Sequence, residues 1–433
     1  MTTVAGPAPD PTGEPAEPVN VAERSRPWSE RLAGALAHRN YRLLWFAALG
    51  STIGTWMQSY AQSWLIFDLT HSNFYLGLDS FLGQLPILLF MLIGGVIADR
   101  HDRRRLLTGS QYVQAFAALT LAALVATGHV TIALIFLLSF TAGLGQAFGG
   151  PAYQAMIPSL VPRRDLPNAI ALNSTQFNLS RVLGPVAGGF VLAGIGVAWC
   201  FTLNGLSFFL VVLALASLTL PPHVANANPR ALGEELRGGL RYVRGQRLLT
   251  VLTILAFVTT FLAMPVSTFL PAFATQFLTG DQAPEKRLAM LMASQGLGAI
   301  VGALMIGSLG RFRHMGRALL TGQILLGLFV AAFATSRILP LSLALIFLAG
   351  IASMAVFSMS FSMLQLTVPD ELRGRVVSIY MVALRGGWPL GSLIAGALSD
   401  RFTAPAVMIV NSGVLILIAG ALLLRKHGTL QKM

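Results

Sequence analysis

The sequence predicts an all-α integral membrane protein with twelve transmembrane helices in two pseudo-symmetric six-helix bundles. Three observations support this fold class. Hydrophobic residues make up 55% of the 433 residues, charged residues only 11%, and the mean hydropathy is +0.69. Apolar runs are separated by short polar turns, and one longer polar segment divides the runs into two sets of six. Compositions of this kind lie outside the range of soluble proteins.

The apolar runs predict the order of the spans. Because a helix rises 1.5 Å per residue, about 20 apolar residues cross the hydrocarbon core of a bilayer. Runs of sufficient length lie at 43–67, 74–98, 106–127, 130–155, 168–193, 197–220, 248–276, 288–309, 317–335, 339–366, 375–399 and 404–424. We therefore expect residues 41–220 to form the first bundle and residues 248–424 the second.

Three segments are too polar to cross the membrane. Residues 1–40 are expected to be a disordered cytoplasmic segment, because the beginning is rich in Pro, Ala, Glu and Gly and has no apolar period. Residues 425–433 are expected to be a cytoplasmic tail. The linker, 221–247, carries apolar residues at three- and four-residue spacing, namely Leu232, Leu236, Leu240 and Val243. This spacing predicts an amphipathic helix on the inner membrane surface, and the alternative is a plain tether between the halves.

The basic residues predict the orientation of the chain. The net charge is +13, but the arginines are spread over short turns rather than gathered on one face, so nucleic acid is not expected as a partner. If both termini are cytoplasmic, 24 of the 30 Lys and Arg residues lie on the inner side and four lie in outer turns. This bias predicts that both termini are cytoplasmic and that the lipid bilayer surrounds the chain. The single cysteine, Cys200, excludes an internal disulfide.

Internal duplication supports the division into two halves. Leu107-Thr108-Gly109 recurs 213 positions later as Leu320-Thr321-Gly322, and Arg104 then aligns with Arg317. The copies are not equal, because the position that matches Asp99 is Phe312. Two halves that are related by an axis along the membrane normal are typical of transporters that expose a central site alternately to the two sides of the membrane.

A short basic turn after the second span carries the first motif. The stretch from Gly94 to Arg105 contains small residues, one acid and several arginines, and it resembles the loop between helices two and three of the major facilitator superfamily. The resemblance implies a gate in which Asp99 meets the inner end of span eleven. The residues assigned to it are Gly95, Asp99, Arg100, Arg103 and Arg104. The alternative is an orientation anchor with no moving part.

Other segments narrow the resemblance. Asn40-Tyr41-Arg42, Gly54-Thr55-Trp56-Met57-Gln58 and the stretch from Pro369 to Arg375 are similar to the bacterial branch that includes the enterobactin exporter and other transmembrane secretion effectors. The similarity covers roughly residues 38 to 425. It implies an exporter of a drug-like or siderophore-like molecule in the bacterial inner membrane, driven by the proton gradient.

Span five contains a glycine-rich stretch with a proline. Gly184, Pro185, Gly188 and Gly189 make a helix surface that permits close packing and a kink. The stretch resembles the superfamily motif associated with antiporters, although Ser180 stands where an upstream glycine is expected. The alternative is ordinary tight helix packing.

Charged residues inside spans are costly and mark functional sites by default. Asp79 in span two and Arg385 in span eleven are candidates for proton coupling, if the two spans meet and the side chains pair in one state only. A permanent structural ion pair is the alternative. Arg181 in span five, with polar neighbours, predicts a hydrated site for an anionic or multiply hydroxylated substrate, unless the arginine is structural. The cavity candidates are Gln58, Gln62, Gln176, Asn178 and Arg181.

An enzyme is not expected. The inner loops are too short for a catalytic domain, and the sequence has no phosphate-binding Gly-x-x-x-x-Gly-Lys-Ser/Thr and no metal-ligand spacing, so neither a cofactor nor a metal is expected. Two rivals to a small-molecule exporter stay open. One is a lipid or lysolipid flippase of the same fold, and the other is a membrane sensor or scaffold that transports nothing.

Overall fold

The computed structural model describes residues 34–219, 232–279, 281–309 and 314–424. The side chains at 92, 96, 98–100, 232–237 and 370–371 also lie outside the described part. Within it nearly every residue is helical, and the isolated bridge between Thr279 and Ile338 is the only β-type pairing there. The prediction of an all-α protein is confirmed.

The first half consists of six long helices and two short 3-10 turns. The turns are η2 (Ala35–Ala37) and η3 (Arg163–Asp165). The long helices are α2 (Arg39–Thr70), α3 (Asn73–Arg100), α4 (Arg103–Ala126), α5 (Ile132–Leu160), α6 (Leu166–Ile195) and α7 (Val197–Ala216).

The second half begins with a linker helix, α8 (Leu232–Gly245). The long helices that follow are α9 (Arg247–Ala263), α12 (Pro284–Leu309), α13 (Met315–Thr335), α14 (Leu339–Thr367), α15 (Asp370–Phe402) and α16 (Ala404–Leu424). Helix α8 packs on α15, where a Cβ added at Gly239 would lie 3.0 Å from Ile379, and Val243 is buried. The linker therefore contains the helix that its spacing predicts.

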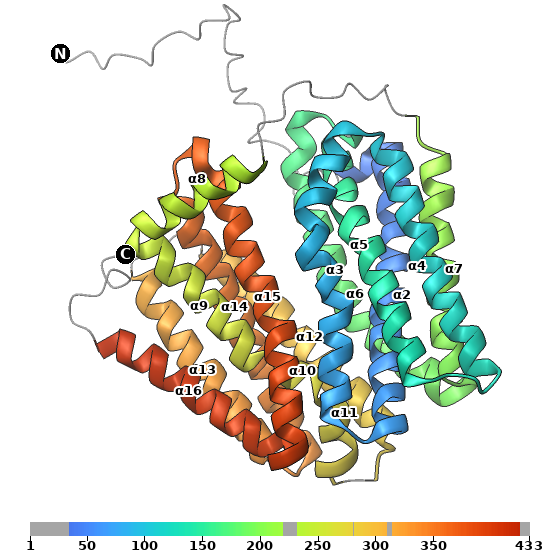
Figure 1. The fold of residues 1–433 in the computed structure, drawn as a ribbon, viewed down its shortest axis with the longest axis vertical. Coiled ribbons are helices and arrows are strands. Elements are labelled where there is room, and N and C mark those ends of the chain that lie inside the picture. Colours follow the sequence, from blue (N-terminus) through green and yellow to red (C-terminus); the bar gives the residue numbers. More distant parts are fainter. Residues whose placement is uncertain (1–33, 220–231, 280, 310–313, 425–433) are drawn as a thin grey trace, which may run out of the picture.

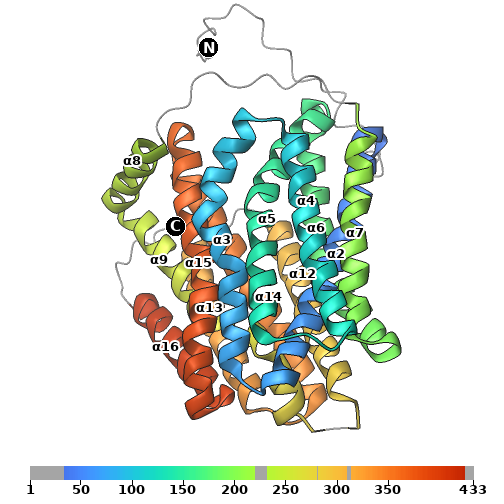
Figure 2. The same ribbon diagram turned by 45° about the vertical axis from the view of Figure 1, so that its right-hand side comes forward.

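Eleven helices in the described residues are long and apolar enough to cross a membrane. Helix α2 is the twelfth long helix, and it runs alongside the others (Figure 2). Its composition is less apolar because Thr55, Gln58, Ser59 and Gln62 face protein or the space between the bundles rather than lipid. Together these helices confirm the predicted twelve spans.

The seventh span differs from the prediction of a continuous run over 248–276. Helix α9 ends at Ala263 and is followed by α10 (Pro265–Thr268), α11 (Leu270–Ala272) and a π-helical turn, η4 (Phe273–Phe277). Pro265 and Pro271 each remove a backbone donor and clash with the preceding turn, which breaks the helix. The broken segment packs against α2, α3 and α15.

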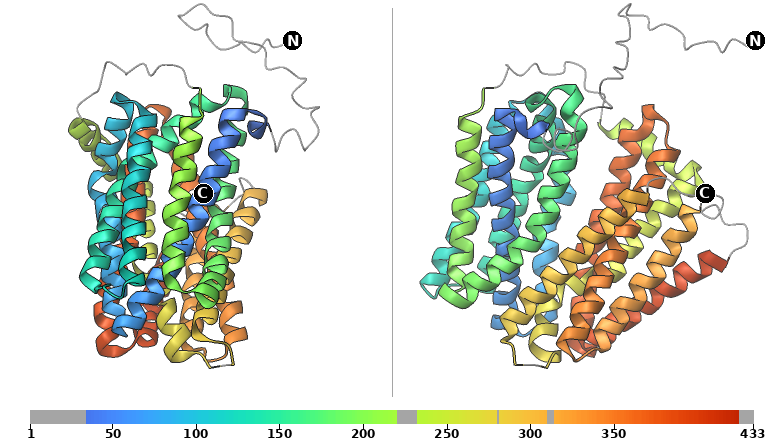
Figure 3. Two further views of the ribbon diagram at one scale, coloured as in Figure 1. Left: turned by 90° about the vertical axis from the view of Figure 1, so that its right-hand side faces the viewer. Right: turned by 180° about the vertical axis from the view of Figure 1, so that it is seen from behind.

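The helices divide into two bundles that lie side by side (Figures 1 and 3). Helix α3 packs on α15 and α6 packs on α12, so these four helices form most of the contact between the bundles. Spans two and eleven therefore meet, as the resemblance implies. We call the end that carries α8 and the turn at 101–102 the basic end, and the end that carries the turns at 71–72 and 403 the opposite end.

The bundles are in close contact at the opposite end and diverge toward the basic end (Figure 1). At the opposite end, a Cβ added at Gly396 of α15 would lie 2.6 Å from the Asn73 carbonyl oxygen, and one added at Gly77 would lie even closer to the Ser392 carbonyl oxygen. Tyr60 also donates across the interface to the Glu285 carbonyl oxygen at 2.8 Å. Toward the basic end, neither Gly95 nor Gly374 has a neighbour within 4 Å of an added Cβ. The conformation is therefore closed at the opposite end.

Candidate functional site

The acid in span two lies inside the first bundle. Both carboxylate oxygens of Asp79 accept from Gln62 Nε2 on α2 at 2.9 Å, and Oδ1 also accepts from Ser139 Oγ on α5 at 2.6 Å. No described cation lies within 4.0 Å of this carboxylate. Neutral donors alone therefore stabilise the charge of Asp79 when it is ionised.

The hydrogen bonds continue from Asp79 through the bundle. Gln58 donates to Gln62 Oε1 at 3.4 Å, and Asn204 on α7 donates to Gln58 Oε1 at 2.6 Å. Ser207 in turn donates to the Asn204 carbonyl oxygen at 2.7 Å. We call Asp79, Ser139, Gln62, Gln58 and Asn204 the polar chain, and it connects α3, α5, α2 and α7. A change in the protonation of Asp79 would rearrange bonds in all four helices.

Arg385 and Asp79 are not paired in this conformation. Arg385 lies seven residues before Ser392, so it shares the face of α15 that contacts α3. Asp79, however, lies about 200° around α3 from Gly77, which is the residue that faces α15. The carboxylate is thereby turned into its own bundle, while Arg385 is exposed where the bundles diverge. A direct pair would require α3 to rotate.

Arg181 lies on the face of α6 that is turned toward the space between the bundles. Gly184 and Gly188 of the same helix contact α2, and Val182 contacts α12. Arg181 and Asn178 lie between these two faces on the helix surface. The lipid-facing side is marked by exposed apolar residues, including Leu183 and Phe190.

The guanidinium of Arg181 is held by aromatic rather than acidic groups. Its Cζ lies 5.8 Å from the ring centroid of Trp56 on α2, and the Trp56 ring packs edge-on against Phe177. No described carboxylate forms an ion pair with Arg181. A cation over an indole ring, with exposed Thr55 and Ser59 nearby on α2, can bind an anionic or hydroxylated aromatic molecule.

The two amides predicted beside Arg181 have local partners. Gln176 is 5% exposed and donates to Thr52 Oγ1 on α2 at 2.8 Å, so it joins two helices rather than facing a cavity. Asn178 donates to the Ser174 carbonyl oxygen at 2.8 Å and is half-buried on the Arg181 face. Of the predicted cavity residues, Asn178 and Arg181 share this face, and Gln58 and Gln62 belong to the polar chain.

The glycine-rich stretch of α6 is a packing surface. A Cβ added at Gly188 would lie 2.6 Å from the Tyr60 ring, and one at Gly184 would collide with Trp56 Cβ on α2. At Gly189 the neighbour is Ala289 of α12, 2.7 Å away in the other bundle. Pro185 is buried among them. The stretch lets α6 lie close to α2 in its own bundle and to α12 in the other bundle. Such a surface is compatible both with fixed helix packing and with sliding of α6 along its neighbours.

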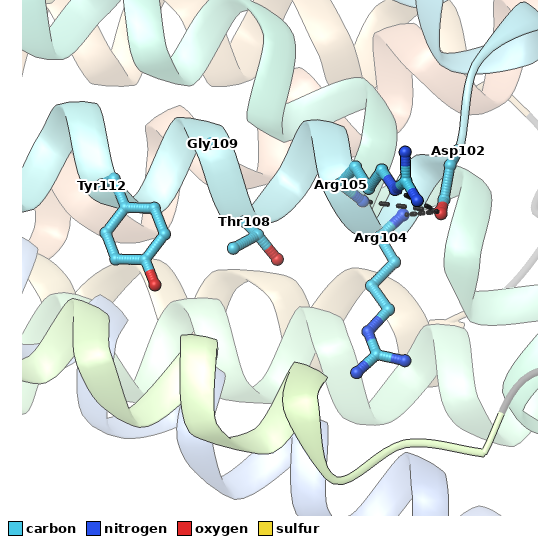
Figure 4. Close-up of a pocket in the computed structure, with 6 residues that line it drawn as sticks. All are labelled: Asp102, Arg104, Arg105, Thr108, Gly109 and Tyr112. Atoms are coloured by element: carbon cyan, nitrogen blue, oxygen red, sulfur yellow. Dashed lines mark hydrogen bonds and ion pairs between the residues drawn. The ribbon is translucent and has the colours of Figure 1, made fainter.

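The basic turn contacts the ends of neighbouring helices, and its Asp102, Arg104 and Arg105 lie close together at the start of α4 (Figure 4). Asp102 Oδ1 accepts from the backbone nitrogens of Arg104 and Arg105 at 2.9 and 3.4 Å, which caps α4. Arg103 donates to the Ala155 carbonyl oxygen at 2.8 Å, and Arg104 donates to that of Ala216 at 2.9 Å. These arginines therefore neutralise the carboxyl ends of α5 and α7.

The predicted gate is only partly described. Helix α3 extends to Arg100, but the side chains of Asp99 and Arg100 lie outside the described residues. A Cβ added at Gly95 would have no neighbour within 4 Å, whereas one added at the neighbouring Gly94 would lie 2.5 Å from the Ala147 carbonyl oxygen. Gly94, rather than Gly95, is thus the glycine that the packing of α3 on α5 requires.

Ser139 and Asn204 were missed by the sequence analysis. Each lies in a predominantly apolar span, Ser139 near Thr141 and Asn204 near Ser207. A polar side chain in a span must find a partner, so Asn204 in span six carried a usable signal. Ser139 carried a weaker one, because a serine can satisfy its hydroxyl on its own helix.

Two bundles of six spans, meeting through antiparallel helices and turning a polar face toward the space between them, define a membrane transporter of the major facilitator fold. A family model described as transmembrane secretion effector matches residues 31–431, and the chain belongs to that family.

Individual relatives agree with this assignment. The chain is 28% identical over 399 residues to the enterobactin exporter EntS of Shigella boydii, which covers 92% of this chain and 94% of the relative. It resembles a bacterial homologue of the human lysosomal transporter Spinster, in an inward-facing and occupied conformation, with a TM-score of 0.71 at 15% identity over 89% of this chain and 96% of that one. It also resembles the peptide transporter POT in complex with sulfate, with a TM-score of 0.71 at 12% identity over 94% and 100%. The two structures support the fold.

Proposed function

We propose that this protein is a secondary active exporter that exchanges protons for a small anionic or multiply hydroxylated molecule by alternating access. The observation that carries the proposal is the position of Asp79, an intramembrane carboxylate held only by neutral donors of other helices. Its similarity to an enterobactin exporter favours outward movement of the cargo. Its fold is the one in which two bundles rock about a central site.

Asp79 is the proposed proton-binding group. When ionised it accepts from Gln62 and Ser139, and protonation would remove the charge and turn one carboxylate oxygen into a donor. The bonds along the polar chain would then have to change, which shifts α2 relative to α3 and α7. Arg385 is a second proposed group, engaged only after α3 rotates.

Arg181 is the proposed cargo-binding group. It is the only described arginine on the face of α6 between α2 and α12, and Trp56, Phe177 and Asn178 lie beside it. These side chains match a molecule that carries both negative charge and aromatic or hydroxyl groups. Release on the far side would follow when the bundles separate at the opposite end.

The proposed orientation places the basic end in the cytoplasm of a bacterium, with both termini on that side of the inner membrane. Asp99, Arg100, Arg103 and Arg104 would then act as a cytoplasmic gate that closes when the opposite end opens. Asp99→Asn should reduce flux without reducing membrane insertion, and unchanged flux would remove Asp99 from the proposal.

Purified protein in proteoliposomes tests the proposal. Enterobactin, the cargo in the name of the exporter described above, is the first probe, followed by a panel of anionic aromatic compounds. We expect uptake into vesicles of defined orientation to rise when a pH gradient is imposed. Flux that ignores the gradient would exclude proton antiport, movement of a fluorescent lysolipid alone would indicate a flippase, and no flux of any probe would favour a sensor or scaffold.

A further inference from the structure

The amino terminus of α3 is capped by a carboxylate from the other bundle. Ser72 is the N-cap residue of α3, but its own side chain caps no backbone nitrogen of that helix. Instead Asp400, near the end of α15, accepts from the Asn73 backbone nitrogen at 2.8 Å and from the Ser72 hydroxyl. A carboxylate at a helix amino terminus is stabilised by the free N–H groups and by the helix dipole.

This cap can exist only while the bundles are closed at the opposite end. Asp400 and Asn73 lie on different bundles, and the glycine contact of Gly396 with the Asn73 carbonyl oxygen holds them at the same level. Asp400 is exposed at the end of the interface, and Arg401 beside it is also exposed. Separation of the bundles at this end would remove both acceptor bonds at once.

The local sequence around Asp400 repeats that of the basic turn. Gly396-Ala397-Leu398-Ser399-Asp400-Arg401 follows the same pattern as Gly95-Val96-Ile97-Ala98-Asp99-Arg100, with 301 positions between them. The internal duplication does not produce this match, because its spacing places Phe312 opposite Asp99. Instead the two copies end α3 and α15, which are antiparallel neighbours. Each helix therefore carries an acid where the other helix begins.

We propose that Asp400 is the latch of the closed opposite end, because its carboxylate caps α3 only while the two bundles are in contact there. The proposal rests on the alternating access proposed above. In the present conformation Asp400 caps α3. When the opposite end opens, Asp400 loses this contact, so the cap favours the closed conformation.

Distances between spin labels test this proposal without any cargo. Cysteines replace His129 and Thr335, which are exposed near the opposite end on different bundles, in a chain whose buried native thiol is removed by Cys200→Ala. Double electron–electron resonance then gives the populations with a short and a long distance. Asp400→Ala should raise the ratio of open to closed populations at this end by about 2- to 30-fold, as expected for loss of a helix cap.

Two further variants make the test specific. Arg401→Ala removes a neighbouring exposed charge and should leave the distribution unchanged, while Asp400→Glu should restore part of the closed population. If Asp400→Ala gives the same distribution as Arg401→Ala, the latch is wrong. Flux in proteoliposomes is measured separately. If Asp400→Ala leaves the distance distribution unchanged and flux is normal, the latch alone is refuted. If Asp400→Ala shifts the distribution but the protein moves no cargo, the transport function alone is refuted.

Discussion

Gln62 on α2 donates through one amide nitrogen to both carboxylate oxygens of Asp79 on α3, 2.9 Å from each. The same nitrogen lies 2.8 Å from Ser139 Oγ, so α2, α3 and α5 meet at one point. Gln62 lies on α2, the helix that also carries Trp56 of the proposed cargo site. The acid is therefore connected to this helix through Gln62. Binding of one proton at Asp79 thus has a direct route to a movement of α2.

Asp79→Asn should uncouple transport from the proton gradient. The amide keeps the size of the side chain but cannot be ionised, so we expect gradient-driven flux to fall by about 10- to 100-fold, the effect of losing a hydrogen bond to a charged group. Exchange of labelled for unlabelled cargo at equal pH should persist. Asp68→Asn is the matched control, because Asp68 is exposed at the end of α2 and lies outside the polar chain. Gradient-driven flux equal to that of the control would contradict the coupling role.

The spans were predictable from the sequence because hydropathy and length decide whether a segment crosses a bilayer. The depth of each residue in the membrane was also predictable from its position in a span. This depth identified Asp79, Arg181 and Arg385 as rare charged residues within the spans. The rotation of each helix was not, because neighbours on other helices determine which face is buried. Asp79 is consequently turned toward Gln62 rather than Arg385, and Gln176 toward Thr52 rather than a cavity.

The break in the seventh span was missed for a different reason. Pro265 and Pro271 were visible in the sequence, but prolines are tolerated within several other helices of this chain, such as Pro185 in α6 and Pro389 in α15. Helix α5 also carries two prolines, Pro151 and Pro158, without a break. Neither the presence nor the spacing of prolines therefore distinguishes the broken segment in the sequence.

Arg181→Ala should weaken the binding of an anionic aromatic probe. With salicylate as the probe, we expect the dissociation constant to rise by about 10- to 100-fold, since an interaction of a charged group in a partly desolvated site is lost. Arg181→Lys should have an intermediate effect, because the ammonium group of lysine keeps the positive charge but lacks the planar guanidinium that lies over the Trp56 ring. Isothermal titration calorimetry measures both.

Arg337→Ala is the control for that experiment. Arg337 also lies over an aromatic ring, with its Cζ 5.1 Å from the centroid of Phe277, but at the opposite end and away from α6. Salicylate affinity should be unaffected in this variant. If both arginine variants lose affinity equally, the effect is one of net charge and the assignment of Arg181 to the cargo site fails.

Gly184→Ala should destabilise the first bundle. The added methyl group would meet the Trp56 Cβ and lie 2.9 Å from the Ile53 carbonyl oxygen, and backbone atoms cannot move aside as a flexible side chain can. Overpacking of this kind costs about 1–3 kcal/mol of folding free energy. Gly194→Ala on the same helix meets nothing within 4 Å and should be neutral or slightly stabilising. Thermal unfolding in detergent compares the two, and equal midpoints would mean that α6 and α2 do not pack as described.

Arg104→Ala should loosen the end of α7 rather than act on a gate alone. Arg104 donates to the carbonyl oxygens of Ala216 and Leu218, at 2.9 and 3.4 Å, and its loss leaves the carboxyl end of that helix without a cation. We expect a loss of about 1–2 kcal/mol in stability and faster amide exchange around residues 213–218.

Arg105→Ala is the matched control for Arg104, because the Arg105 side chain is 90% exposed and its ion pair within the described part of the chain is with Asp102, at 3.6 Å. Its exchange pattern should match that of the parent protein. Amide exchange resolved by mass spectrometry separates two explanations of the basic turn. A gate without a structural role predicts lower flux with unchanged exchange in Arg104→Ala, whereas the observed contacts predict faster exchange confined to the end of α7, with any loss of flux following from it.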